Sequence, residues 1–317
     1  MRTDDNMSQN VRDFLEGPAA SLAFPRTALV DQRVSSDYLE LLRQPRPAVD
    51  NSLVCPVGTL RELQISEHVR VRVYVPEGSG PWPTLIYYHG GGWVTGDLDM
   101  HDLTCRLLAS RSQLVVVNVD YRLAPETTFP GPFLDAYEAL EWTYEHIEEY
   151  GGRSDSISVA GSSAGANLAA AVTLKARDDR GPAIAVQVLI CPVTDSSQST
   201  DSYRRNGEGL YIDRWQMQWF WDSYIPDPAD RSSAYASPAH AESLEDLPPA
   251  IVVVAGLDPL VDEGLEYAAR LEREANGATV WTYPGQIHGF MGLIGVLNDA
   301  KPAVERLADA LAQRLHR

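Results

Sequence analysis

Cysteine, basic side chains and long apolar runs are all scarce in this chain of 317 residues. The three cysteines, Cys55, Cys105 and Cys191, form no Cys-x-x-Cys pair, so we expect buried, reduced thiols and no disulfide framework. Lys and Arg number 26 against 44 Asp and Glu, and the net charge of −18 argues against nucleic acid or an anionic membrane as a partner. The apolar run 250–255 is far shorter than the ~20 residues of a membrane helix, and no signal-peptide core follows the acidic N-terminus. These absences predict a cytoplasmic protein.

Motifs for metals and nucleotide cofactors are also missing. The seven histidines show no His-Glu-x-x-His or other ligand spacing, so we expect no metal. The sequence contains neither a phosphate-binding loop nor a Gly-x-Gly-x-x-Gly fingerprint, so we expect no cofactor.

Two glycine-bearing motifs each follow an apolar run. His-Gly-Gly-Gly at 89–92 follows the run 84–88, and Gly-Ser-Ser-Ala-Gly at 161–165 follows the run 156–160. A glycine loop of the first kind offers backbone N–H donors to an oxyanion, and a Gly-x-Ser-x-Gly turn exposes a serine hydroxyl between a strand and a helix. The Gly-x-Ser-x-Gly pattern alone is a weak signal and His-Gly-Gly-Gly is a rarer one, and the pair predicts acyl transfer on Ser163.

These motifs and further blocks resemble the hormone-sensitive-lipase-like (bacterial family IV) carboxylesterases of the α/β-hydrolase superfamily. The similarity runs from about residue 60 to the C-terminus, and its other blocks are Asp120 to Glu126, Phe129-Pro130, Gly256 to Glu263 and Ile287 to Phe290. Two positions depart from the family, which usually has Asp or Thr at Ser162 and often Gly at Ala166. The reaction class is unaffected by these departures, but they leave the substrate preference open.

Alternating strand and helix patterns predict a doubly wound, mostly parallel sheet, the α/β-hydrolase fold that the resemblance also implies. Expected strands lie at 68–75, whose alternating pattern is typical of a half-buried strand near a sheet edge, and at 84–88, 114–119, 157–160, 186–190, 250–255 and 279–283. Expected helices lie at 102–112, 132–150, 164–178, 262–276 and 299–315. Residues 51–194 and 239–317 would form the catalytic domain. Residues 1–50 and the aromatic-rich insertion 195–238 would form a helical cap.

Ser163 is the expected nucleophile, and its hydroxyl needs a base to take the proton. Only His89 and His288 lie in glycine-bearing loops directly after predicted strands. In this fold the nucleophile precedes the acid and the acid precedes the histidine along the chain, so we predict His288 as the base. His89 remains the competitor, although a role in bracing the glycine loop fits it better.

Asp258 is the expected acid, because it follows the apolar strand 250–255 and lies between nucleophile and base in the chain. Asp262 and Glu263 are alternatives. Their other interpretation is favourable charge in the first turn of a helix.

The resemblance implies that the backbone N–H groups of Gly91, Gly92 and Ala164 form the oxyanion hole. Glycine suits this loop because a Cβ would hinder the close approach of the reacting carbon. His89 and Gly90 are expected to support the loop.

Aromatic residues crowd the insertion, and some of them are expected to face the substrate while others only pack. The candidates for the substrate pocket are Trp93, Trp215, Trp219, Ser162 and Ile287.

The predicted function is hydrolysis of short- to medium-chain acyl esters, with a small-molecule ester as the only expected partner. An amide or peptide hydrolase with the same triad is the first alternative, and a non-catalytic small-molecule receptor of the same fold is the second. The sequence leaves open whether the chain forms a homodimer.

Overall fold

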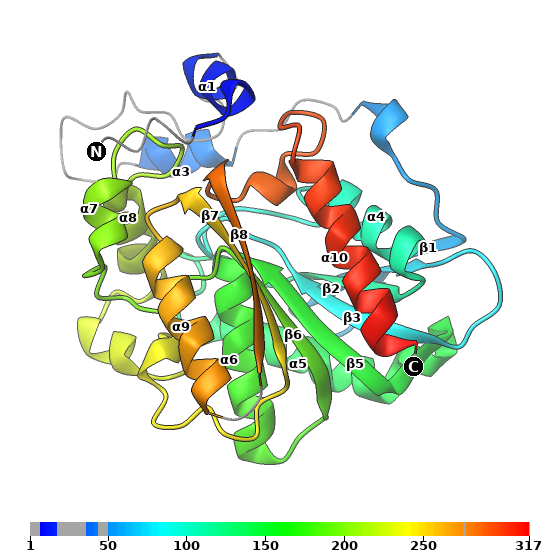
Figure 1. Cartoon of the computed structure of the whole chain (residues 1–317). Coiled ribbons are helices and arrows are strands. Elements are labelled where there is room, and N and C mark those ends of the chain that lie inside the picture. The colour runs from blue at the N-terminus through cyan, green and yellow to red at the C-terminus, as the bar shows by residue number, and fades with distance from the viewer. Residues whose placement is uncertain (1–6, 18–35, 44–49, 275–276, 317) are drawn as a thin grey trace.

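The computed structural model describes residues 7–17, 36–43, 50–274 and 277–316, and a single eight-stranded sheet lies at its centre (Figure 1). The strands are β1 (Thr59–Gln64), β2 (Arg70–Val75), β3 (Trp82–Tyr88), β4 (Val115–Asp120), β5 (Gly152–Ser162), β6 (Ile184–Ile190), β7 (Ala250–Leu257) and β8 (Ala278–Ile287). Their spatial order is β1-β2-β4-β3-β5-β6-β7-β8. Strand β2 pairs antiparallel with β1 and β4, and all the other pairs are parallel, which confirms the predicted sheet.

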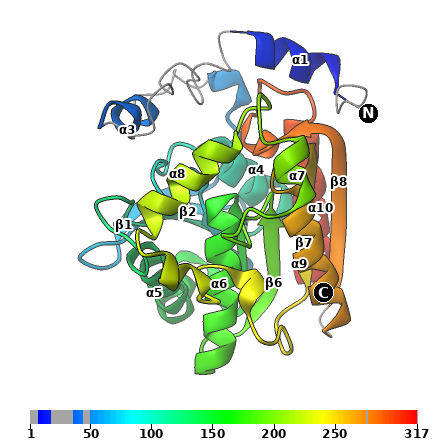
Figure 2. The same cartoon turned by 90° about the vertical axis from the view of Figure 1, so that its left-hand side faces the viewer.

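Helices cover both faces of the sheet (Figures 1 and 2). One face carries α4 (Asp102–Ser112) and α10 (Ala300–Leu315), and the other carries α5 (Gly131–His146), α6 (Ala164–Asp179) and α9 (Val261–Arg273). The valine-rich strand β4 shows why both faces of the sheet must be covered by helices. Val115 and Val117 belong to the core beneath α5, α6 and α9, whereas Val116 belongs to the opposite core, because successive side chains of a strand point to opposite faces.

Two elements differ from the sequence-based expectation. Strand β1 was not expected, because its exposed Arg61 and Glu62 interrupt the apolar pattern, and it places β2 one strand in from the edge. The helix expected over 132–150 ends at His146, and the chain continues as the 3₁₀ turn Ile147–Tyr150.

Four helices of the segments expected to form a cap lie toward the carboxyl ends of the parallel strands (Figures 1 and 2). They are α1 (Gln9–Glu16), α3 (Ser36–Leu42), α7 (Asp201–Arg205) and α8 (Arg214–Tyr224). The interval 195–238 is described throughout and contains no strand, as expected. Within residues 1–50 the structure describes 7–17, 36–43 and Asp50, and the rest of this predicted cap segment lies outside the described residues.

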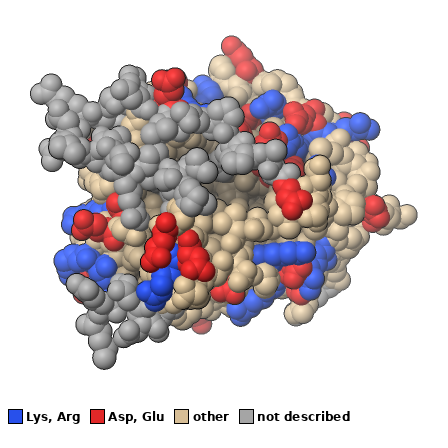
Figure 3. Space-filling view, turned by 90° about the horizontal axis from the view of Figure 1, so that it is seen from above, with Lys and Arg blue, Asp and Glu red and all other residues tan. Residues whose placement is uncertain are grey.

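Polar contacts tie the first of these segments to the rest of the molecule. The Arg43 guanidinium pairs with the Glu126 carboxylate at 2.7 Å, and the Gln216 amide of α8 donates to the Tyr38 hydroxyl at 3.0 Å. Seen from above, acidic and basic side chains are interspersed over the described surface (Figure 3). The chain's negative charge is therefore not gathered into one patch on this face.

Candidate active site

Ser163 occupies a tight turn between β5 and α6. Its φ of +57° is rare for a residue with a side chain, and such strain is typical of a nucleophile elbow. A Cβ at Gly161 would overlap the carbonyl oxygen of Gly165, and a Cβ at Gly165 would overlap that of Tyr88. The Ser163 N–H donates to the carbonyl of Ile190 at 2.8 Å, which anchors the turn to β6. The Gly-x-Ser-x-Gly spacing is therefore a steric requirement of this turn.

His288 and Asp258 meet the serine at the carboxyl edge of the sheet. Strands β7 and β8 are neighbours, and the loops that follow them carry Asp258 and His288. The imidazole Nε2 lies 2.8 Å from Ser163 Oγ, and Nδ1 lies 2.7 Å from Asp258 Oδ2. Asp258, His288 and Ser163 are only 1%, 4% and 7% exposed. Because an ionised carboxylate can only accept, Nδ1 carries the proton and Nε2 is left to accept from the serine hydroxyl.

Neighbouring backbone and cap groups hold the Asp258 loop. The Leu260 N–H donates to Asp258 Oδ1 at 2.8 Å. The Asn206 amide donates to the carbonyl oxygens of Gly256 and Asp258, each at 3.0 Å. Asn206 directly follows α7, so the insertion helps to fix the acid loop.

The two alternative acids make other contacts. Asp262 pairs with Arg205 at 2.9 Å and accepts the Ser202 N–H at 2.7 Å. Glu263 accepts the Thr194 N–H at 2.7 Å, and burial raises the pKa of its carboxyl well above the ordinary value. Both lie in the first turn of α9, where they join the helix to the start of the insertion.

The glycine loop approaches the turn that carries Ser163. Gly91 has a φ of +115°, and a Cβ there would overlap the carbonyl oxygen of Thr95. Among the residues that the structure describes, no acceptor takes the N–H groups of Gly91, Gly92 or Ala164. Ala164 is the first residue of α6, so its N–H is one of the donors that a helix leaves unpaired at its N-terminus. These N–H groups are the ones that an oxyanion hole would use.

Two buried histidines support the glycine loop. His89 Nδ1 donates to the carbonyl of Gly90 at 2.8 Å, and its ring stacks on Tyr121 with centroids 4.2 Å apart. His101 Nε2 accepts the Gly90 N–H at 3.4 Å, while its Nδ1 lies 3.2 Å from the Tyr87 hydroxyl. Sequence reasoning assigned support to His89 but missed His101, a single histidine in a segment without a motif.

The candidate pocket aromatics divide between the cap and the core. Trp219 meets Tyr38 edge-on with centroids 4.8 Å apart, and Trp215 contacts the same ring at 5.6 Å. The Trp93 ring is fully buried and stacks on Tyr224 with centroids 4.4 Å apart. This contact indicates a packing role for Trp93 and does not place it in the pocket.

Phe220 is an aromatic residue of α8 that the structure places against the glycine loop. A Cβ at Gly92 would overlap its ring, so the ring lies directly on the glycine backbone. The sequence offered no way to choose Phe220 over its aromatic neighbours on α8. The two remaining pocket candidates are also buried: Ser162 ends β5, with its carbonyl facing Gly90, and Ile287 ends β8 in the core beneath α4 and α10.

The described residues contain one group of potential metal ligands, formed by Cys191, Asp258 and His288 within 4.8 Å of one another. Ligands around a tetrahedral zinc ion stand roughly 3.3 Å apart. Nδ1 of His288 and Oδ2 of Asp258 are 2.7 Å apart, so they share a proton and leave no room for a cation between them. This arrangement fits a hydrogen-bonded relay better than a metal centre.

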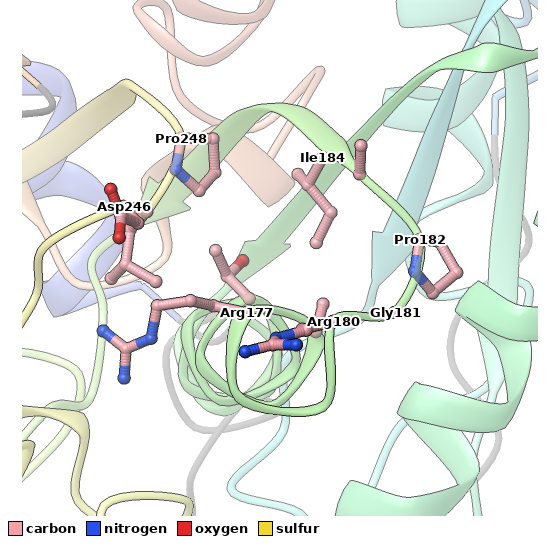
Figure 4. Close-up of a pocket in the computed structure, with 11 residues that line it drawn as sticks. Arg177, Arg180, Gly181, Pro182, Ile184, Asp246 and Pro248 are labelled. Carbon is pink, nitrogen blue, oxygen red and sulfur yellow. The ribbon is translucent and has the colours of Figure 1, made fainter.

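A cavity of about 300 Å³ lies away from this edge, between the end of α6 and the start of β6 (Figure 4). Arg177, Arg180 and Asp246 are among the residues that line it. Helix α6 begins beside Ser163 and has 16 residues, which correspond to about 24 Å. The cavity is therefore too far away to hold the bond that Ser163 would attack.

The sheet and the residues at its carboxyl edge define an α/β-hydrolase. The chain belongs to the family described as alpha/beta hydrolase fold, which matches residues 85–292. It is 41% identical over 289 residues to Esterase LipI of Mycobacterium tuberculosis, covering 88% of this chain and 90% of that protein. It is 40% identical over 256 residues to Carboxylic ester hydrolase LipN of the same species, covering 78% and 68%. A thermostable esterase from Pseudomonas putida has a TM-score of 0.84 at 34% identity, covering 98% of each chain.

These comparisons confirm the resemblance to carboxylesterases that the sequence blocks indicated. In the described part of the chain, every helix is too short or too polar to cross a membrane.

Proposed function

We propose that this chain is a serine carboxylesterase that forms an acyl-enzyme on Ser163. The observation that carries the proposal is the continuous hydrogen-bond relay from Asp258 Oδ2 through His288 to Ser163 Oγ, with distances of 2.7 and 2.8 Å. Esterase LipI and the Pseudomonas putida protein named Ethyl acetate hydrolase, 35% identical over 249 residues, support an ester as the substrate.

In the first step the Ser163 oxygen attacks the ester carbonyl carbon while His288 Nε2 takes the hydroxyl proton. Asp258 keeps the imidazole in the required tautomer and stabilises the imidazolium. The N–H groups of Gly91, Gly92 and Ala164 stabilise the oxyanion. When the tetrahedral intermediate collapses, the bond to the alcohol oxygen breaks and the alcohol leaves with the proton from His288.

In the second step water replaces the alcohol. His288 takes a proton from the water, whose oxygen attacks the acyl carbon and releases the carboxylic acid as Ser163 regains its proton. His288 handles every proton in the two steps and no atom changes its oxidation state, so the reaction requires no redox partner.

The segments 1–50 and 195–238 act together as the cap and limit the length of the substrate. The Phe220 ring lies on the oxyanion loop, and the Tyr38, Trp215 and Trp219 rings pack around the same helix. A bounded aromatic site of this kind favours small, water-soluble esters over an oil surface. We therefore propose acyl chains of roughly two to eight carbons, because each buried methylene adds about 0.8 kcal/mol only until the pocket is full.

Replacement of the nucleophile tests this function. Ser163→Ala should reduce hydrolysis of p-nitrophenyl butyrate by several orders of magnitude, because no other group makes the covalent bond. Ser158→Ala is the matched control, since it removes a fully buried hydroxyl of the same strand β5 outside the relay. Turnover by Ser163→Ala within tenfold of the parent would refute the assignment. A p-nitroanilide cleaved as fast as the matching ester would favour amide hydrolysis.

A further inference from the structure

A buried thiol lies against the acid and the base of the proposed triad. Cys191 directly follows β6, and its side chain is 1% exposed. Its Sγ, a carboxylate oxygen of Asp258 and a ring nitrogen of His288 lie within 4.8 Å of one another. Strand β6 lies between β5, which leads to the nucleophile, and β7, which leads to the acid. Cys191 therefore lies between the strands that lead to Ser163 and Asp258, and its sulfur is close to His288.

The backbone holds Cys191 in a conformation that few residues other than glycine adopt. Its φ is +46°, and left-handed backbone at a residue with a Cβ is strained. The Cys191 N–H donates to the Val253 carbonyl at 2.8 Å, and the preceding Ile190 carbonyl accepts the Ser163 N–H at 2.8 Å. The same short segment therefore anchors the nucleophile turn and places the thiol beside the acid.

The contacts of the sulfur define its hydrogen-bonding role. Burial, and then the charge of Asp258, raises the pKa of the Cys191 thiol well above its ordinary value, so the sulfur keeps its proton. The Gly289 and Ala255 backbone amides and the Asp258 carboxylate are the groups that act on the thiol, and Sγ lies within 4.8 Å of an Asp258 carboxylate oxygen. A protonated thiol is a donor, and an ionised carboxylate only accepts.

We propose that Cys191 is a positioning residue for ester hydrolysis, because its S–H donates to the Asp258 carboxylate and holds that group opposite Nδ1 of His288. The inference rests on the function proposed above. The thiol is then a third donor to the carboxylate, after the Leu260 N–H and the imidazole. The S–H group interacts with part of the negative charge of the Asp258 carboxylate, and this part is then no longer available to attract the imidazolium.

Removal of the S–H donor should shift the pH profile of hydrolysis in one definite direction. Without the S–H, the carboxylate attracts the imidazolium more strongly, so His288 keeps its proton to higher pH. The acid limb of the kcat/KM profile then moves to higher pH by about half a unit, and kcat falls roughly fivefold. In the described part of the chain, Tyr203 interacts with Asp258 and Tyr87 interacts with Cys191, and burial raises the pKa of both tyrosines well above the ordinary value. Both therefore stay neutral over the range of the assay.

The experiment compares Cys191→Ala with Cys191→Ser, since serine keeps a donor of similar size. Cys105→Ala is the matched control, because it removes a second fully buried thiol on α4. For each variant kcat and KM for p-nitrophenyl butyrate are measured from about pH 5 to 8.5, with Ser163→Ala as the blank and a melting curve to confirm folding.

The alanine variant should show the shifted limb and the lower kcat. The serine and Cys105→Ala variants should keep the parent's limb and stay within about threefold of its kcat. An unshifted limb in Cys191→Ala, or a folded serine variant that loses tenfold or more, would overturn the proposal and leave the thiol a packing role. If Cys191→Ala does not fold, the folded serine variant decides alone, and a loss of tenfold or more in its kcat overturns the proposal. Failure of the esterase function itself is seen separately, as turnover that survives Ser163→Ala.

Discussion

Phe220→Leu should lengthen the preferred substrate. The Phe220 side chain is almost fully buried on α8, and its ring lies on the Gly92 backbone. The ring is therefore next to one of the proposed oxyanion donors, where the reacting carbonyl would sit. Leucine is shorter and leaves space at that point without introducing a polar group.

The structure and the transfer free energy of a methylene set the size of the effect. Exchange of Phe for Leu removes about three side-chain carbon atoms, and partial relaxation leaves room for about two methylenes. Each buried methylene contributes about 0.8 kcal/mol, which corresponds to about fourfold in kcat/KM. For an ester two carbons longer than the parent's best substrate, the kcat/KM of Phe220→Leu should thus exceed that of the parent by up to about 15-fold.

Two homologous ester series provide the assay. In p-nitrophenyl esters the acyl chain is lengthened, and in alkyl acetates the alcohol is lengthened. We expect the optimum to move by about two carbons in the series whose variable group lies against Phe220. Phe133→Leu is the matched control, because Phe133 is equally buried but stacks on Tyr235 with centroids 5.1 Å apart. Equal optima for the parent and Phe220→Leu in both series would refute this placement of the ring.

Two further predictions concern buried ionisable groups. Burial, the largest effect, raises the pKa of Glu263 well above its ordinary 4.5, so the folded state keeps this proton to higher pH than the unfolded chain. The resulting stability is present below pH 4.5 and is lost as pH rises through the folded-state pKa. Glu263→Gln should therefore gain in Tm relative to the parent from pH 5 to 8, and a difference independent of pH would contradict this. Burial also raises the pKa of Cys105 and Cys191 well above the ordinary value, while Cys55 is partly exposed. Iodoacetamide should modify only Cys55 in the folded protein and all three thiols after denaturation, as mass spectrometry would show; native labelling of Cys191 would contradict its burial.

The nucleophile turn could be predicted because its steric constraints lie close together in the sequence. Gly161 and Gly165 are only four residues apart, although a Cβ at Gly161 would meet the Gly165 backbone within the turn and a Cβ at Gly165 would meet the Tyr88 carbonyl of the neighbouring strand β3. The apolar strands were predictable for a similar reason, since a parallel strand covered on both faces has few polar positions. Strand β1 escaped prediction because it lies at the sheet edge, where Arg61 and Glu62 can face solvent.

The supports of the glycine loop could not be predicted from local patterns. His101 and Phe220 are 11 and 128 residues away from the loop residues that they contact, Gly90 and Gly92. Nothing next to either residue in the sequence marks it, because a buried histidine or phenylalanine is usual in any core. Their roles arise only when α4 and α8 pack beside the loop.

Cys191 shows how strand register can decide the chemistry of a residue. Residue type alone predicted a small buried side chain, and this is correct. Its neighbours depend on the pairing of Ile190 with both Ser162 of β5 and Val253 of β7. A shift of one residue in this register would turn every side chain of the strand to the other face of the sheet. The thiol would then lie away from Asp258, with every local pattern in the sequence unchanged. The register follows from the packing of the whole sheet, so the contact between thiol and acid can be found only in the folded structure.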